Sequence, residues 1–311
     1  MVSSQWLHDP DGEQRGTVSY ISCASRSRTA DRNIENRVRE SLKAEPRAPP
    51  VALTIAGSDS GGGAGVQADL KTFHAYGVFG TSAITAVTVQ NTRGVEAIHK
   101  VPAQLVAAQV IAVATDLRPA ACKTGMLADA AIIKAVAGAL TDTGITPVVV
   151  DPVMVAASGD SLLEEEAVVA LRQTLLPLSR LVTPNLDEAE IITGRSVRSQ
   201  SEMRAAAEAL VEEGCDAALV KGGHLEGDEV IDVLFDGAAW REWRAPRLSS
   251  RGAHGTGCTL SAAVTAGLAS GSSLEESVDR GIRFTREAIR TGLGLGGGSS
   301  PLSHWVDPGS L

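Results

Sequence analysis

The chain has 311 residues, an apolar fraction of 43% and 32 glycines, a composition typical of a globular α/β protein with many tight turns. Its formal charge of −9 and aromatic fraction of 3% argue against nucleic-acid binding, because such surfaces are basic and stack bases on aromatic rings. No apolar run approaches the roughly 18 residues that a membrane-spanning helix needs. We therefore expect neither a nucleic-acid nor a membrane partner.

The four cysteines, Cys23, Cys122, Cys215 and Cys258, lie far apart and form no CxxC pair. A disulfide framework or a zinc site is therefore not expected. The N-terminus also lacks the apolar stretch of a secretory signal. Together these features predict a cytoplasmic protein, because the cytoplasm keeps thiols reduced.

Residues 1–50 differ from the rest of the chain, because they are polar, rich in Ser and Arg, and end in a proline-rich segment. We expect them to form a disordered N-terminal extension. Residues 22–32 faintly resemble a transit peptide, but the acidic residues around them oppose that alternative. No linker-like segment interrupts the remainder, so residues 51–311 are predicted to form one domain.

From Val51 onward, short β-branched apolar runs alternate with helical segments of roughly 12 to 15 residues, the pattern of βαβ units. The predicted strands are 51–56, 83–89, 120–123, 148–151, 181–183 and 218–220. The Asp236-Gly237 pair between residues 231–235 and 239–243 predicts a hairpin that adds antiparallel strands at one edge. Helices over 259–269 and 274–291 close the chain, so the fold class is α/β with a mostly parallel sheet.

A glycine-rich loop over residues 57–65 lies between the first predicted strand and helix. Such a loop lets backbone N–H groups approach an anion or a polar ring. Its glycines match neither the Walker nor the dinucleotide-binding pattern. A purely structural turn is therefore an equally open interpretation at this point.

A second glycine turn, Gly255-Thr256-Gly257-Cys258, leads into a helix of small residues. The first N–H groups of a helix have no intrahelical partner and lie at its positive dipole end, so they can hold phosphate oxygens. At such a helix start the pKa of the Cys258 thiol can fall below its reference of about 8.5, which would suit a general base. The alternative is a small cysteine that only packs in the helix.

Polar residues follow three further predicted strands, namely Asp151, Asn185 with Glu188, and Lys221. Asn185 and Glu188 share one face of a first helical turn and could provide oxygen ligands for Mg²⁺. Helix capping explains the same spacing equally well. Because ligands of open α/β sheets bind beyond the carboxyl ends of the strands, all these motifs could converge there.

Taken together, the motifs closely resemble the hydroxymethylpyrimidine and phosphomethylpyrimidine kinases of thiamine biosynthesis, which belong to the ribokinase-like superfamily. The resemblance runs in order over 51–305. It rests on residues 54–59, 62–71, 90–92, 123–127, 151–154, 183–188, 221–224 and 254–260.

This resemblance implies a three-layer ribokinase-like fold, with a central mostly parallel sheet between helices. It implies transfer of a phosphoryl group from ATP with Mg²⁺ to the hydroxymethyl oxygen of the pyrimidine, and then a second transfer that makes the diphosphate. The substrate-binding residues that it implies are Gly57, Asp69, Gln90, Met126 and Val153. Gln90 suits this role chemically, because an amide offers a donor beside an acceptor.

For the phosphoryl transfer itself, the resemblance implies that Gly255, Thr256 and Gly257 form an anion hole and that Cys258 acts as the base. Lys221, Asn185 and Asp151 would lie on the nucleotide side. Glu188 and Asn185 would bind the metal. The partners would then be only the pyrimidine and ATP, with a homodimer as one option for the assembly.

Two segments depart from the family pattern. Ser60-Gly61 replaces the more common Pro-Ser, a change for which we expect little effect. Residues 294–301 only loosely resemble the family's closing segment, so contacts from this stretch are not assigned. Two alternatives stay open: a pyridoxal or pyridoxine kinase of the same superfamily, and a catalytically inactive pyrimidine-binding protein.

Overall fold

The computed structural model describes residues 2–8, 14–21, 48–154, 165–248 and 254–311. The chain divides into two compact units, Met1–Ala48 and Pro49–Leu311. In the first unit, β1 (Val2–His8) pairs antiparallel with β2 (Gln14–Ile21). Most of the predicted disordered extension lies outside the described residues, so its disorder stays a prediction.

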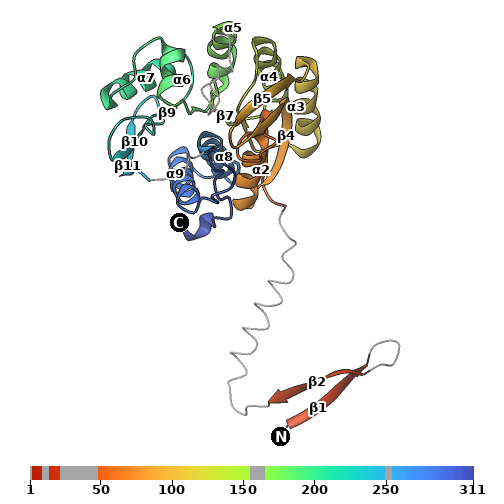
Figure 1. The fold of residues 1–311 in the computed structure, drawn as a ribbon. Helices are drawn as coiled ribbons and strands as arrows, with labels where there is room; N and C mark the ends of the chain where they lie inside the picture. The colour runs from red at the N-terminus through yellow and green to blue at the C-terminus, as the bar shows by residue number, and fades with distance from the viewer. Residues whose placement is uncertain (1, 9–13, 22–47, 155–164, 249–253) are drawn as a thin grey trace. The chain divides into compact units, whose positions relative to one another are not determined.

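The second unit is built on a nine-stranded sheet with the order β11-β10-β9-β8-β7-β6-β3-β4-β5 (Figure 1). Its strands are β3 (Val51–Ser58), β4 (Phe79–Asn91), β5 (Gly94–Lys100), β6 (Ala121–Thr124), β7 (Val148–Val150), β8 (Leu181–Val182), β9 (Ala218–Val220), β10 (Glu229–Phe235) and β11 (Trp240–Pro246). The six central strands of this order, β9, β8, β7, β6, β3 and β4, run parallel to one another. At the two edges, β5, β10 and β11 pair antiparallel with their neighbours. The predicted mostly parallel sheet is therefore confirmed.

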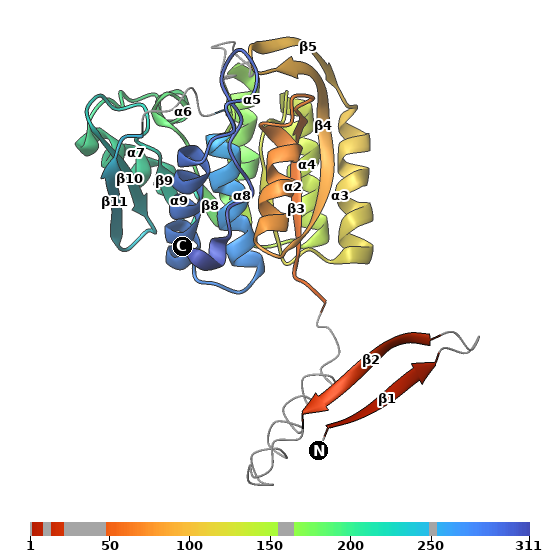
Figure 2. The same cartoon turned by 60° about the horizontal axis from the view of Figure 1, so that its bottom comes forward.

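Helices cover both faces of this sheet and complete three layers (Figure 2). On one face lie α2 (Gly65–Ala75), α8 (Thr256–Ala269) and α9 (Leu274–Arg290). On the other face lie α3 (Ala103–Leu117), α4 (Ala130–Thr143), α5 (Glu165–Ala170), α6 (Leu186–Thr193) and α7 (Gln200–Glu212). Short helical turns follow at η1 (Leu171–Leu175), η2 (Leu176–Leu178) and η3 (Pro308–Ser310).

The predicted hairpin at Asp236-Gly237 is confirmed, since β10 pairs with β11 in antiparallel register. Asp236 closes the turn, because its carboxylate accepts hydrogen bonds from the backbone N–H groups of Ala238 and Ala239 at 3.0 and 2.6 Å. The rings of Phe235 and Trp240 stack across the pair with centroids 4.5 Å apart. Side-chain and backbone chemistry within one short segment thus determines this element.

Strand β5 forms a second antiparallel edge that we did not predict. Most of its side chains are exposed, so it shows no alternation of buried and exposed residues. It is held by backbone pairing to β4, whose start also lies four residues before the predicted residue 83. An edge strand of this kind lacks the apolar pattern on which sequence-based assignment depends.

Candidate functional site

A cavity of about 780 Å³ opens at the carboxyl ends of the parallel strands, between these strand ends and the start of α8. Asp151 directly follows β7, and Lys221 directly follows β9. Of the predicted site residues, those that line the cavity are Gly57, Gln90, Met126, Asp151, Val153, Asn185, Glu188, Lys221, Gly255, Thr256, Gly257 and Cys258. The expected convergence of the motifs is therefore observed, with Asp69 as the exception.

The start of α8 forms one wall of the cavity. Gly255 precedes the helix with φ of 87°, a left-handed conformation that a glycine adopts without a Cβ penalty. A Cβ at Gly257 would lie 3.1 Å from the ammonium nitrogen of Lys221, so the helix backbone passes close to that charge. The helix dipole and Lys221 together make this wall attractive to phosphate oxygens.

Asp151 and Lys221 form an ion pair in the cavity, with 3.1 Å between the ammonium nitrogen and the carboxylate. Ser261 donates to the other carboxylate oxygen at 3.2 Å, and Thr183 donates to the first at 3.3 Å. Burial acts to raise the pKa of Asp151, but the charges of Lys221 and Lys123 outweigh it and hold the pKa below its usual value. Asp151 is therefore an anion in the unliganded protein.

Asn185 and Glu188 form a capping box at the start of α6. The Asn185 side chain accepts from the Glu188 N–H at 2.9 Å, and the Glu188 carboxylate accepts from the Asn185 N–H at 2.7 Å. The structural alternative for this spacing is thus realised, and a metal-binding role for either residue stays a prediction. Burial of Glu188 and the nearby Asp151 raise its pKa to about 7, although Lys221, 3.9 Å away, opposes the shift.

These oxygens fit a magnesium ion that is bound mainly by phosphates. Among the described residues, no group of three or more His, Cys, Asp or Glu side chains could hold a metal ion. Mg²⁺ commonly takes only one or two carboxylates and completes its shell with water and substrate phosphates. Glu188 and Asp151 lie in the cavity wall and could supply such carboxylates.

Cys258 is the third residue of α8 and lines the cavity. The expected fall of its pKa is wrong for the unliganded protein, because burial raises the pKa of the thiol to about 12. The ammonium of Lys123 acts in the opposite direction, whereas the carboxylates of Asp69 and Asp151 raise the pKa further. Desolvation of a thiolate thus outweighs the favourable helix terminus.

Asp69 does not line the cavity as the sequence predicted. It is fully buried in α2, where Lys123 contacts one carboxylate oxygen at 2.9 Å and Thr54 donates to the other at 2.6 Å. Both oxygens are thus used within the protein, and both members of the ion pair are inaccessible to solvent. Asp69 is placed to neutralise Lys123 in the core, and a contact of its carboxylate with the substrate stays a prediction.

Gly57 and Met126 lie against each other in the wall near Gln90. A Cβ at Gly57 would lie 2.7 Å from the terminal methyl of Met126, so only glycine leaves this methyl in place. Thr85 donates to the Met126 carbonyl at 2.6 Å and holds that backbone. Met126 thus contributes an apolar side chain to the cavity lining, and such a side chain suits the face of a ring.

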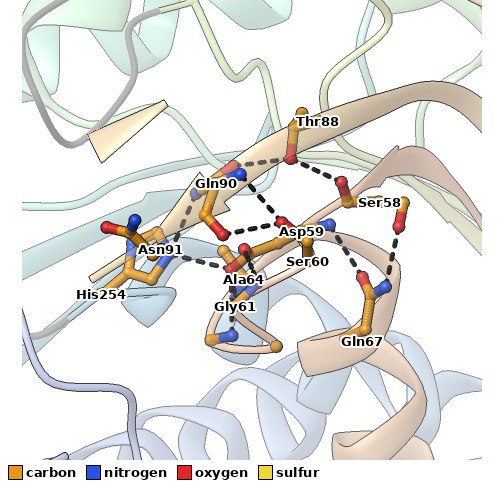
Figure 3. A network of polar contacts seen from close by, with 12 residues as sticks. Ser58, Asp59, Ser60, Gly61, Ala64, Gln67, Thr88, Gln90, Asn91 and His254 are labelled. Atoms are coloured by element: carbon orange, nitrogen blue, oxygen red, sulfur yellow. Dashed lines mark hydrogen bonds and ion pairs between the residues drawn. The ribbon is translucent and has the colours of Figure 1, made fainter. Parts of the chain in front are cut away.

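Sequence reasoning assigned no role to Asp59 or His254, although both lie in motifs that it singled out. His254 Nε2 lies 3.0 Å from Asp59 Oδ2 and 3.2 Å from the Gln90 amide. Figure 3 shows the ring between these two side chains. Asp59 directly follows β3, and His254 precedes the second glycine turn, 195 positions later. Only the fold brings them together, so no local pattern indicates the contact.

The two segments that depart from the family pattern both lie beside Gln90. The Ser60 hydroxyl donates to the Gln90 carbonyl at 2.7 Å and accepts from the Gln90 N–H at 2.8 Å. Ser299 donates its N–H to the Thr92 carbonyl at 2.8 Å. The loop at Ser60 therefore anchors the end of β4, where Gln90 lies.

Residues 59–303 match the family model described as phosphomethylpyrimidine kinase. The chain belongs to this family. It is 52% identical over 258 residues to the hydroxymethylpyrimidine/phosphomethylpyrimidine kinase of Rhizobium meliloti, covering 82% of this chain and 97% of that protein. The protein of the same description from Bacillus subtilis is 48% identical over 256 residues, with 82% and 94% covered.

Among solved structures, the ADP complex of Bacillus subtilis pyridoxal kinase superposes with a TM-score of 0.78 at 35% identity. The match covers 83% of this chain and 98% of that one. The predicted ribokinase-like architecture is thereby confirmed. In the described part of the chain, we find no helix whose length and apolarity would let it cross a membrane.

Proposed function

We propose that the protein transfers a phosphoryl group from ATP to 4-amino-5-hydroxymethyl-2-methylpyrimidine and then phosphorylates the monophosphate to the diphosphate. The observation that carries this proposal is that one cavity, in a member of the phosphomethylpyrimidine kinase family, combines two kinds of wall. One part of the lining contains the amide of Gln90 and the apolar side chain of Met126. The other has Lys221 and the start of α8, which suit phosphates.

In the first transfer, the hydroxymethyl oxygen forms a bond to the γ-phosphorus while the bond from that phosphorus to ADP breaks. The N–H groups at the start of α8 and the ammonium of Lys221 would stabilise the charge on the transferred group. The hydroxyl proton would pass to Cys258. Because the pKa of this thiol is about 12 in the unliganded protein, its thiolate must form within the substrate complex.

Mg²⁺, when bound with ATP, would neutralise the phosphate charges that meet in the cavity. Glu188 and Asp151 would hold it through their carboxylates, with Asn185 beside them. Deprotonated Glu188 is needed for this role, so its pKa of about 7 makes metal binding stronger as the pH rises through neutrality.

A two-step assay tests the proposal directly. The full chain is supplied with the hydroxymethylpyrimidine, ATP and Mg²⁺, and the products are separated by chromatography. We expect the monophosphate first and the diphosphate later. Absence of both products would contradict the proposal, and tight pyrimidine binding without turnover would indicate an inactive binding protein instead.

Pyridoxal is a second candidate substrate, favoured by the structural similarity to pyridoxal kinase at a TM-score of 0.78. The greater identity to the curated pyrimidine kinases, 48% to 52%, supports the pyrimidine as the better substrate. We therefore expect kcat/KM to be higher for the pyrimidine than for pyridoxal. A higher kcat/KM for pyridoxal would reverse this assignment.

A cytoplasmic location and a homodimer complete the proposal. The cysteines of the described residues, Cys122, Cys215 and Cys258, are free thiols, which suits a reducing compartment. Val87 and Val89 on strand β4 are 51% and 55% exposed, and neighbouring exposed apolar side chains on one face of a strand favour association. Sedimentation analysis of the full chain would measure the oligomeric state.

A further inference from the structure

The ring of His254 lies between a buried carboxylate and the amide of Gln90 (Figure 3). The side chains of His254 and Asp59 are only 11% and 3% exposed. The Asp59 carboxylate also accepts from the backbone N–H groups of Gly61, Gly63 and Ala64 at 2.7, 3.0 and 2.8 Å. These contacts leave few possible arrangements of hydrogen atoms.

The hydrogen on His254 follows from the charge of Asp59. Burial acts to raise the pKa of Asp59, but the hydrogen bonds from His254 and from the backbone outweigh it, so this carboxyl is an anion that only accepts. At 3.0 Å from the carboxylate, His254 Nε2 must therefore carry the hydrogen. The other neutral tautomer would direct a nitrogen lone pair at a buried anion.

The orientation of the Gln90 amide also follows from which neighbouring atoms carry hydrogens. With the amide nitrogen toward the ring, as Figure 3 draws it, two N–H groups would oppose each other across 3.2 Å. The Thr88 hydroxyl directs its one hydrogen to the Ser58 carbonyl at the shorter distance of 2.8 Å, which leaves its lone pairs facing Gln90 at 3.1 Å. Turning the amide over removes both conflicts, because the nitrogen then donates to Thr88, and the oxygen faces the Nε2 hydrogen of His254, which it shares with the Asp59 carboxylate in a three-centre hydrogen bond.

We propose that His254, held by Asp59, is a positioning residue that locks the Gln90 amide in this orientation and thereby determines which ring isomer the site accepts. The inference rests on the proposed function. After the contacts to His254 and Thr88, Gln90 retains one N–H and one oxygen lone pair. That pair matches a ring nitrogen beside an exocyclic amine, whereas the reversed amide would match a ring N–H beside a carbonyl.

The surrounding backbone places the imidazole for this role. A Cβ at Gly63 would lie 2.7 Å from His254 Cδ2, so the glycine loop makes room for the ring. The backbone N–H of His254 donates to the Ser300 carbonyl at 3.3 Å, and the His254 backbone forms a parallel β-bridge with Pro301. The backbone of His254 is therefore held by the C-terminal segment, and its ring is held by Asp59.

The kinetic test compares two substrates in the full chain and in two variants. The substrates are the hydroxymethylpyrimidine and its 4-oxo analogue, in which a carbonyl and a ring N–H replace the amine and the ring acceptor. His254→Leu removes the ring N–H, whereas His254→Gln keeps a donor near the same place. We expect His254→Leu to lower the amine-over-oxo ratio of kcat/KM by about tenfold or more, chiefly through KM.

His254→Gln should retain most of the discrimination of the wild type. If His254 only supports the local structure, both variants lose kcat/KM equally on the two substrates and the ratio does not change. That result would overturn the inference. Turnover of neither substrate by the wild type would instead contradict the proposed function.

A second measurement does not depend on turnover. Nitrogen NMR of the unliganded full chain, labelled at histidine, reports which imidazole nitrogen carries the hydrogen. The resonance of His254 is assigned by its loss in His254→Gln, and we expect a protonated Nε2. A His254 tautomer protonated only at Nδ1 would overturn the inference whatever the substrate proves to be.

Discussion

Cys258 shows how two local effects compete at one residue. The start of α8 favours an anion by a dipole equivalent to roughly half a charge, screened beyond the first turn. Burial of the thiol and the carboxylates of Asp69 and Asp151 favour the neutral form and raise the pKa to about 12. For the proposed role of Cys258 as the base, added positive charge such as that of Mg²⁺ would have to lower this pKa, because the negative phosphates of ATP act in the opposite direction.

Cys258→Ala separates the two phosphoryl transfers. The first attacking group is an alcohol that must lose a proton, so we expect kcat to fall by about 10²-fold or more, with a smaller effect on KM. In the second transfer the attacking phosphate oxygen is largely ionised at neutral pH, since its second pKa is about 6. The rate of this second transfer should therefore fall much less in Cys258→Ala. Single-turnover measurements with the alcohol and the monophosphate would test this, and equal losses in both steps would argue against a base.

The protonation of Glu188 affects the free energy of unfolding of the protein. Its pKa rises from 4.5 to about 7 on folding, chiefly through burial, so the folded state holds a proton that the unfolded state releases. The stabilising contribution is fully present below pH 4.5 and is lost as the pH rises through about 7. We expect the free energy of unfolding of the wild type, relative to Glu188→Gln, to decrease between pH 5 and 8, as measured by urea unfolding.

A matched control for this experiment is Glu208→Gln on the exposed face of α7. It removes the same charge from a site without burial, so its difference from the wild type should vary little over the same pH range. If the differences for the two variants followed the same course with pH, burial of Glu188 would not be the cause.

At the scale of elements, the approach of α8 to the glycine loop depends on Gly255. Its φ of 87° and the carbonyl of Gly63, against which a Cβ would collide, both require glycine. We expect Gly255→Ala to displace the helix start and to lower kcat by about 10²-fold, the cost typical of losing an oxyanion donor. The measurement is kcat in the two-step assay alongside the thermal midpoint.

Gly271→Ala separates backbone strain from the collision. Gly271 follows the other end of α8 with φ of 85°, but a Cβ there would meet nothing within 4 Å. Gly271→Ala should lower the thermal midpoint with little effect on kcat. A similar loss of kcat in both variants would show that strain alone, rather than the position of the helix start, accounts for the result.

The elements also differ in how far sequence predicts them. The Asp236-Gly237 hairpin is recognisable because its turn residue makes its own backbone contacts. Strand β5 is not recognisable from its sequence, because it is stabilised by pairing with β4 and exposes most of its side chains. Backbone pairing between strands leaves no mark on the composition of either strand.

At the scale of the whole molecule, the kinase site lies within the unit Pro49–Leu311, which contains every residue of the cavity. We expect a chain that begins at Pro49 to retain the kcat and KM of the full chain. Its thermal midpoint should also be unchanged. Side-by-side assays of the two chains would measure this, and a clear loss of activity in the shorter chain would assign a role to residues 1–48.

The sequence alone predicts the order of βαβ units, because strand and turn chemistry is local, and its resemblance to a known family indicates most of the residues that line the cavity. The tertiary structure decides how these residues behave. It buries Asp69 against Lys123, raises the pKa of Cys258 and places His254 beside Asp59 and Gln90. Desolvation and contacts between distant segments depend on how the layers pack, and no local pattern of residues contains that information.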